Sequence, residues 1–283
     1  MKIFVVNLTR RRDRLAAMSA QLRALSLDFE RVPACDVKDA SGEYLDRYVA
    51  AKGPLGDLTK GDRCCFVSHM RAWNTFLGSG APYGVILEDD IRLGASASDL
   101  LRQSDWVPPN VELLKLEHFG PEHQRVLVGP AVDVWGGHAV ARIRSRHTGA
   151  GAYVLSRAAA RTLVWFGLKW RVSVDHVLFN PNVSPVAHFL RPYQLLPAIA
   201  RQDSELGGGS DIAASRKAQR RLSMAFVKRE IVRAYYEIRL LPQQIMSVAA
   251  GRARLVCVRN EGMAEPADLR TFADIAKMRT RRA

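Results

Sequence analysis

The stretch YGVILEDDI, residues 83–91, decides the fold of this chain. Residues 83–87 form an apolar run with the length and β-branched content of a buried strand. Glu88, Asp89 and Asp90 follow at once, so three carboxylates stand where the strand reaches the carboxyl edge of its sheet. Open α/β sheets bind ligands at that edge. The stretch therefore predicts either a ligand site in an α/β protein or a solvated acidic turn that only follows a strand.

Strand and helix patterns alternate on both sides of this stretch. Residues 3–6 form a β-branched and aromatic run, and apolar residues recur at helical spacing over residues 12–25. Thr59 and Asp62 have the spacing of a helix N-terminus, and we expect that helix to end at Gly78. Further expected elements are strands at 29–33, 111–116, 126–128, 152–155 and 186–190, a helix at 158–166 and a long loop at 36–58. The alternation predicts a mixed α/β sheet flanked by helices on both faces.

The positive charge is concentrated near the end of the chain. The 283 residues carry a net charge of +14, and residues 215–283 hold 16 Lys and Arg against 6 Asp and Glu, a net charge of +10. The change follows the run Gly207-Gly208-Gly209-Ser210, whose backbone freedom suits a connection. We therefore expect a catalytic domain at residues 1–214 and a basic, mostly helical region at residues 215–283. A glycine-rich loop inside one domain is the alternative.

The basic region contains an amphipathic pattern. Apolar residues recur there at three- and four-residue steps, with the charges mostly off that seam. The apolar set is Met224, Val227, Ile231, Ala234, Tyr235, Ile238 and Leu241, and the basic set is Lys217, Arg220, Arg221, Lys228, Arg229 and Arg233. Such a helix either packs on the catalytic part or attaches to the anionic inner leaflet of a membrane. Nucleic acid binding is not expected, because few aromatic residues interleave with the charges.

The composition also bounds the compartment. No apolar run reaches the roughly 18 to 20 residues that cross a bilayer, and residues 1–8 are too short for a secretory signal. The four cysteines form no CxxC pair, which favours a reducing compartment and argues against a zinc site. We expect a cytoplasmic protein, free or peripheral on the inner face of the plasma membrane.

The three adjacent acids predict a cation. Neighbouring carboxylates repel each other unless a proton or a cation intervenes, and Mg²⁺ or Mn²⁺ prefers carboxylates, waters and phosphate oxygens. A diphosphate ligand is therefore plausible. Alternate residues of a strand point to opposite faces, so Glu88 and Asp90 are expected on one side and Asp89 on the other. Asp90 is the favoured metal ligand, with Glu88 as a second ligand, while Glu88 or Asp89 holds water or the sugar and ribose hydroxyls.

Five segments occur in an order that is more specific than any one of them alone. They are FVVNLTRRRDR (4–14), LTKGDRCCFVSHMRAW (58–73), VILEDDI (85–91), GAGAYVLSRAAARTL (149–163) and SVDHVLF (173–179). They resemble the INLxxRxDR, LTxGExGCxxSHxxxW, acidic, GTxAYxxSxxxAxxL and VDxxL motifs of glycosyltransferase family 25, the bacterial lipooligosaccharide sugar transferases. The resemblance covers most of residues 1–214 and departs where Asp62 replaces Glu and Cys64 replaces Gly.

The resemblance implies a GT-A type, Rossmann-like fold, a nucleotide-sugar donor, commonly UDP-galactose, and Mn²⁺ or Mg²⁺ at the acidic motif. The acceptor it implies is a glycolipid or oligosaccharide, such as lipooligosaccharide. Asn7, Arg10, Arg11 and Arg14 follow the first strand, where Asn can read a base or ribose and Arg can hold phosphate. Their alternative role is to cap the first helix with solvated charges around it.

Three further histidine and serine positions are candidates. Ser68 and His69 lie about two turns into their helix, so they either contact the donor or acceptor or are hydrogen-bonded core residues. His188 lies in the last expected strand and is a candidate metal ligand, although an isolated histidine is often structural.

An inverting sugar transfer needs a base that takes the proton of the acceptor hydroxyl. Asp175 is the preferred base, with a helix N-cap as its structural alternative, and Glu117, after the strand at 111–116, is a rival. The sequence therefore predicts a metal-dependent, inverting hexosyltransferase. The competing hypothesis is a non-enzymatic basic protein that binds a membrane surface or nucleic acid.

Overall fold

The computed structural model describes residues 1–120, 125–166, 169–203 and 224–262. The first half contains β1 (Lys2–Asn7), α1 (Arg12–Ala24), β2 (Phe29–Pro33), α2 (Gly42–Asp46), β3 (Lys52–Gly53), β4 (Gly56–Asp57), α3 (Lys60–Gly78), β5 (Tyr83–Glu88), β6 (Ile91–Leu93), α4 (Ala97–Arg102), β7 (Leu113–Lys115) and β8 (Glu117–His118). The second half contains β9 (Arg125–Asp133), a 3₁₀ turn (Trp135–Gly137), β10 (Ala139–Ile143), β11 (Ala152–Ser156), α5 (Arg157–Trp165), α6 (Val174–Phe179), α7 (Pro185–Leu190), β12 (Tyr193–Leu196), β13 (Ala200–Gln202), α9 (Met224–Ala249) and β14 (Arg254–Cys257).

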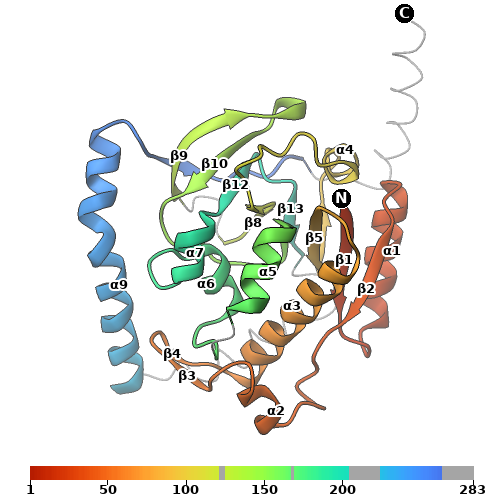
Figure 1. Cartoon of the computed structure of the whole chain (residues 1–283), viewed down its shortest axis with the longest axis horizontal. Coiled ribbons are helices and arrows are strands. Elements are labelled where there is room, and N and C mark those ends of the chain that lie inside the picture. Colours follow the sequence, from red (N-terminus) through yellow and green to blue (C-terminus); the bar gives the residue numbers. More distant parts are fainter. Residues whose placement is uncertain (121–124, 167–168, 204–223, 263–283) are drawn as a thin grey trace, which may run out of the picture.

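A nine-stranded mixed sheet organises these elements, in the order β14-β9-β10-β12-β7-β11-β5-β1-β2 (Figure 1). β1 pairs in parallel with β2 and β5, whereas β11 runs antiparallel to β5 and β7. A small sheet of β6, β13 and β8 and a hairpin of β3 and β4 complete the described strands. The mixed α/β sheet flanked by helices that the sequence predicts is confirmed.

Alternation along the central strands explains why helices cover both faces. In β1, Phe4 packs into one hydrophobic cluster and Val5 into another, and in β5 the same holds for Ile86 and Leu87. Members of the first cluster come from α3, α5 and α6, and members of the second come from α1 and α4. A strand buried on both faces must be apolar at every position, which is the pattern read in the sequence.

Among the described helices before α9, α3 is the longest, and it begins as predicted. The Thr59 hydroxyl accepts a hydrogen bond from the Asp62 backbone N–H, and the Asp62 carboxylate accepts one from the Thr59 backbone N–H. This capping box satisfies two N–H groups that an isolated helix would leave open. It also fixes the residue at which α3 begins.

Several expectations differ from the structure. Residues 185–190 form α7 rather than a strand, because Ser184 caps the segment and Pro185 occupies its first turn, a position that suits proline in a helix. The expected long loop at residues 36–58 contains α2 and the β3–β4 hairpin.

The C-terminal region is more than a helix. The expected boundary at 214/215 and the Gly207-Gly208-Gly209-Ser210 run lie outside the described residues, as do Lys217, Arg220 and Arg221. Further along, β14 pairs antiparallel with β9 at the edge of the main sheet. Glu261 accepts a hydrogen bond from the Ser96 backbone N–H. Part of the basic region thus belongs to the same folded body as the main sheet. None of the described helices is both long and apolar enough to span a membrane.

Candidate functional site

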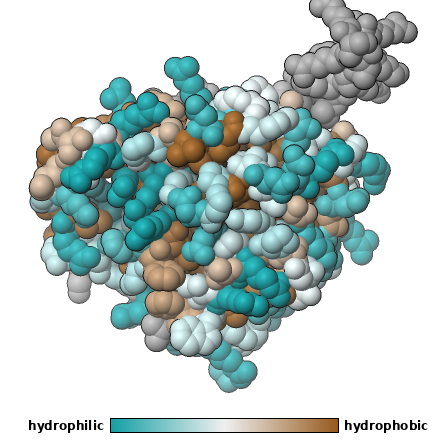
Figure 2. Space-filling view, turned by 45° about the horizontal axis from the view of Figure 1, so that its top comes forward, coloured by the Kyte–Doolittle hydropathy of each residue, from teal (hydrophilic) through white to brown (hydrophobic). Residues whose placement is uncertain are grey.

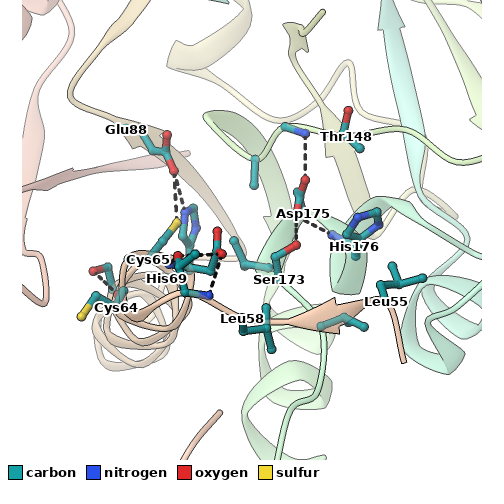
Figure 3. A pocket seen from close by; sticks show the side chains of 18 of the residues that line it. Leu55, Leu58, Cys64, Cys65, His69, Glu88, Thr148, Ser173, Asp175 and His176 are labelled. Carbon is teal, nitrogen blue, oxygen red and sulfur yellow. Dashed lines mark hydrogen bonds and ion pairs between the residues drawn. The ribbon is translucent and has the colours of Figure 1, made fainter. Parts of the chain in front are cut away.

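A cavity of about 790 Å³ opens at the carboxyl ends of β1 and β5 (Figure 3). Its wall is built by the ends of these strands, the first half of α3, the segment at residues 146–150, the start of α6 and one side of α9. Eight of the predicted site residues line it: Arg10, Arg14, Ser68, His69, Glu88, Asp89, Asp90 and Asp175. The strand-edge rule that predicted a ligand site from the sequence therefore leads to a real cavity.

The acidic motif turns where β5 ends. β5 stops at Glu88, and Asp89 and Asp90 form the following turn. One nitrogen of Arg14, Nη1, lies 3.1 Å from Asp89 Oδ1 and 3.2 Å from Asp90 Oδ2. The expectation that Asp89 and Asp90 point to opposite sides is therefore wrong, because strand alternation ends with the strand. All three acids face the cavity.

Asp90 is the carboxylate least compensated by its surroundings. Burial, followed by repulsion from Glu88, raises the pKa of Asp90 to about 7, although Arg14 opposes the rise. Its Oδ1 atom is buried and has no hydrogen-bond partner in the described part of the chain. Burial also raises the pKa of Asp89, against the hydrogen bond from Asn7. A buried, unpaired oxygen beside two more carboxylates fits the donor set of a hard divalent cation.

Glu88 is held by a chain of hydrogen bonds from three aromatic side chains. Trp73 Nε1 donates to Tyr153 Oη at 2.7 Å, Tyr153 Oη lies 2.8 Å from His69 Nδ1, and His69 Nε2 lies 3.1 Å from Glu88 Oε1. The Trp73 indole can only donate, so His69 Nδ1 is the acceptor that remains for the Tyr153 hydroxyl proton. The proton of the neutral histidine then lies on Nε2, which points at Glu88. Burial alone would raise the pKa of Glu88, but the hydrogen bonds from His69 and Cys65 hold it below its ordinary value.

Cys65, His69 and Glu88 also form a possible metal cluster, with one ligand atom each, all within 4.8 Å of one another. The Cys65 Sγ–Glu88 Oε1 distance is 3.7 Å and the His69 Nε2–Glu88 Oε1 distance is 3.1 Å. A tetrahedral zinc ion requires edges of about 3.5 Å and about 3.3 Å between such atoms. The distances fit, but the Nε2 proton assigned by Tyr153 occupies the lone pair that a metal would need. The oxygen set around Asp90 is therefore the better cation site.

The arginines near β1 divide into two groups. Arg10 lines the cavity and its Nε donates to Asp36 Oδ2 at 2.7 Å, and Arg14 bridges the acidic turn. Arg11 instead pairs with Asp13 at 2.8 Å, outside the cavity wall.

Asn7 is also absent from the cavity wall, because its side chain lies beneath the wall and is hydrogen-bonded there. Its Nδ2 donates to Asp89 Oδ2 at 2.7 Å, and its Oδ1 accepts from Arg31 Nε at 3.0 Å. Asn7 is 1% exposed, so it orients Asp89 and does not reach a ligand.

Ser68 ties α3 to the segment after β2. Its hydroxyl donates to the Cys64 carbonyl at 2.7 Å and accepts from the Cys35 backbone N–H at 2.8 Å. The structural role weighed for Ser68 and His69 is therefore present, and both residues also line the cavity.

Asp175 lies across the cavity from Glu88 (Figure 3). It sits in the first turn of α6, whose N-cap is Ser173, so the N-cap role considered for Asp175 belongs to its neighbour. Asp175 accepts hydrogen bonds from the Ser173 hydroxyl, from the His176 backbone N–H at 2.9 Å and from the Gly149 backbone N–H at 3.5 Å. These donors orient a carboxylate that faces the cavity.

Besides Asn7 and Arg11, two further candidates are not brought to the cavity. Glu117 is fully buried and accepts from Lys115 Nζ at 2.6 Å and from the Gly151 backbone N–H at 2.9 Å. It is therefore a partner of a buried lysine rather than a base within reach of an acceptor. His188 lies on α7 and lines a second cavity with Arg142 and Glu112, so its assignment as a metal ligand beside Asp90 is wrong.

Other residues of the site were missed in the sequence. Tyr153 and Trp73 lie within quoted motifs, so their place in the motifs was the available signal. Gln202 Nε2 donates to Glu88 Oε2 at 3.4 Å, and Arg233 and Tyr236 enter the wall from α9. These three come from elements that no local pattern connects to the acidic motif.

The sequence matches one known family. A family profile described as "Glycosyltransferase family 25 (LPS biosynthesis protein)" matches residues 1–178, so the chain belongs to glycosyltransferase family 25.

The relatives that the chain matches are distant in sequence. "Lacto-N-neotetraose biosynthesis glycosyltransferase LgtB" of Neisseria gonorrhoeae is 27% identical over 167 residues, which are 57% of this chain and 59% of that protein. "Lacto-N-neotetraose biosynthesis glycosyltransferase LgtE" of Neisseria meningitidis serogroup B is 25% identical over 243 residues, 78% of this chain and 84% of that protein. "Probable inactive glycosyltransferase 25 family member 3" of Bos taurus is 27% identical over 222 residues, 70% of this chain and 36% of that protein. The match to the first of these spans less than two thirds of its length.

Proposed function

We propose that this protein is a metal-dependent glycosyltransferase. It moves a hexose, with galactose from UDP-galactose as the leading candidate, to a lipooligosaccharide or another surface-glycan acceptor. Family membership supports the reaction class, and the names of the bacterial relatives support the acceptor class. The bovine relative named as inactive makes an experimental test of catalysis necessary.

The single observation that carries the proposal is the uncompensated charge at Asp90. Three carboxylates face the cavity together, and Arg14 is the guanidinium that bridges two of them. Mn²⁺ or Mg²⁺ held by Asp90 and Glu88 would satisfy the unpaired Asp90 oxygen and lower the repulsion. When bound, such an ion supplies positive charge next to the diphosphate of a nucleotide sugar.

The side chains divide the chemistry between two walls. Arg10 and Arg14 lie on the wall of the acidic turn, where guanidinium groups can hold phosphate oxygens and stabilise the charge that grows on the departing nucleoside diphosphate. Asp175 lies on the other wall, oriented by three donors, and takes the proton of the attacking acceptor hydroxyl. Attack from the wall opposite the leaving group inverts the configuration at the anomeric carbon.

Calorimetric titration with nucleotide sugars tests the proposal. UDP-galactose, UDP-glucose and UDP-N-acetylglucosamine are titrated into the protein with Mn²⁺ and again with EDTA, and release of UDP is measured with a soluble acceptor. We expect one donor to bind only with the metal. Asp90→Asn should abolish this binding, whereas the control Asp57→Asn, on the β4 part of the same cavity wall, should retain it.

The outcome also decides between the two functional hypotheses. Donor binding that is unaffected by EDTA, or retained with normal metal dependence in Asp90→Asn, would remove Asp90 from a metal site. Failure of every donor to bind would favour the non-enzymatic basic binding protein.

A further inference from the structure

One side of helix α9 forms part of the cavity wall. Arg233, Tyr236 and Glu237 line the cavity, and Glu237 Oε1 lies 3.3 Å from Arg146 Nη1. Near the other end of the helix, Gln244 Nε2 donates to the Arg144 carbonyl at 3.0 Å. α9 is thus fixed to the catalytic body along one side, and it stands at the edge of the molecule far from β2 (Figure 1).

The other side of α9 is an apolar stripe open to solvent. We define the stripe as Ile231, Tyr235, Ile238, Leu241, Ile245 and Val248, which are all exposed. At about 100° per residue these six positions fall within an arc of about 140°, on the side opposite Arg233 and Tyr236. Ile238 is 63% exposed and Ile245 is 59% exposed. Figure 2, in which α9 again lies at the left, shows hydrophobic residues open to solvent on that side among hydrophilic ones.

Such a stripe requires a partner. Solvent-exposed apolar residues are normally scattered singly, and a continuous stripe marks an interaction surface. Its spacing is that of an amphipathic helix whose apolar side should be buried. The described part of the chain leaves it uncovered.

The charges around the stripe indicate the partner. Both acids of the described part of α9, Glu230 and Glu237, border the stripe on its cavity side, where each is paired with Arg233. Arg239, Arg252 and Arg254 are exposed beside it or just beyond the helix end. The charge at the stripe is therefore positive, within a region that carries +10 over residues 215–283. An anionic lipid surface complements both the apolar stripe and the arginines.

A second copy of this chain fits less well. Each copy carries a net charge of +14, so two copies would bring like charges together around the same stripe. The flanking charges of a self-pairing helix pair with those of the other copy, whereas the acids of α9 are already paired with Arg233 and Arg146 of the same chain.

We propose that the stripe of α9 binds an anionic membrane surface, lying in the interface with its arginines at the headgroups. This proposal rests on the proposed function for its biological meaning, because the same helix would then hold the cavity beside a lipid-linked acceptor. The binding itself is independent of sugar transfer and can be measured without a donor.

Sedimentation with lipid vesicles tests the proposal with the full chain. Vesicles of phosphatidylcholine containing phosphatidylglycerol are compared with phosphatidylcholine alone, at low and high salt. Ile245→Asp places a charge in the stripe, and Gln243→Asp adds the same charge at an exposed position of the same turn outside it. We expect binding to anionic vesicles that weakens with salt, that falls about tenfold or more in Ile245→Asp, and that changes little in Gln243→Asp. Ile238→Asp, one turn away and also exposed, should repeat the loss, and all variants should keep the thermal midpoint of the parent.

Three results would overturn the proposal. The first is equal vesicle binding by Ile245→Asp, Gln243→Asp and the parent. The second is equal binding to neutral and anionic vesicles. The third is sedimentation equilibrium that shows a dimer of the parent which Ile245→Asp dissociates, because the stripe would then bind a second copy. If the protein binds vesicles but no nucleotide sugar, the membrane-binding proposal stands and the transferase proposal is rejected. The two proposals can therefore fail separately.

Discussion

Two acidic groups follow buried strands in this protein, and they have opposite environments. Glu117 follows β7 and is paired with Lys115 at 2.6 Å, with both side chains fully buried. Asp90 follows β5, shares Arg14 with Asp89 and leaves Oδ1 unpaired at the cavity. The same sequence signal, an acid after an apolar strand, therefore marks a structural ion pair in one place and a poorly compensated carboxylate at the cavity in the other.

The difference lies in how each charge is compensated. Burial raises the pKa of Glu117, while Lys115 opposes the rise. Burial lowers the pKa of Lys115, while Glu117 opposes the fall. Each group therefore stabilises the charged form of the other. Repulsion from Glu88 instead adds to the burial of Asp90, and Arg14, which Asp90 shares with Asp89, does not offset the rise in its pKa.

Asp175 is a third acid in this comparison. It lies on the opposite wall of the cavity and is held by backbone and hydroxyl donors. Asp175→Asn removes the proposed base but keeps the shape of the side chain. We expect turnover to fall about 10²- to 10⁴-fold while donor affinity stays unchanged. Initial rates and calorimetry on the same samples separate the two quantities. A loss of donor affinity with turnover reduced in proportion would place Asp175 among the donor-binding groups instead.

Removing the lysine should break the structural ion pair. Lys115→Met keeps the length of the side chain but leaves Glu117 buried without its cation, and we expect the free energy of unfolding to fall by about 3 to 5 kcal/mol. Urea denaturation measures this loss. The double variant Lys115→Met with Glu117→Gln should recover part of it, since no buried charge remains. An unfolding midpoint unaffected by Lys115→Met would show that Glu117 has another source of compensation.

Asp90→Asn should have the opposite effect on stability. The pKa of Asp90 in the fold, about 7, lies above the ordinary value of 3.8. Between about pH 4 and pH 7, Asp90 is ionised in the unfolded chain but still protonated in the folded protein. The free energy of unfolding therefore falls as the pH rises through this range. In EDTA, the variant should therefore gain on the parent across that window, to about 4 kcal/mol at pH 7. Thermal midpoints at several pH values test this. A difference between the two proteins that stays constant with pH would mean that Asp90 does not titrate there.

The aromatic chain that orients Glu88 should give a smaller effect. Tyr153→Phe leaves the Trp73 indole N–H without its acceptor and frees the proton position of His69. We expect a loss of about 1 kcal/mol in the free energy of unfolding, together with weaker Mn²⁺ binding. The second readout matters because a merely structural role would lower stability alone. Unchanged Mn²⁺ affinity in a destabilised Tyr153→Phe protein would limit the chain to packing.

Much of the fold could be predicted from local patterns. The apolar runs of β1 and β5 and the Thr59–Asp62 cap are local signals, and the structure contains all of them. The segment at residues 186–190 was mistaken for a strand because a short apolar run has no decisive period. Ser184 and Pro185, which mark a helix start, were the better signal.

The candidate site was predicted less completely. Arg14 and Asp90 were both expected at the cavity, but their contact depends on how α1 packs beside β5, which no spacing in the sequence gives. Glu117 was misassigned as a base because Lys115 was overlooked. Lys115 lies two residues away, and strand alternation places both side chains on the same face. The sequence shows Lys115 close to Glu117, but only the burial of both side chains in the structure makes them an ion pair.

The sequence by itself determined the class of fold, the strand edge where the cavity lies and the family, because these depend on periodicity and on motifs of consecutive residues. The tertiary structure decided which acids stay uncompensated, which histidine supports Glu88, and which side of α9 faces solvent. Those properties depend on distances between segments far apart in the chain and on the water that packing excludes, and both are set only when the sheet and its helices come together.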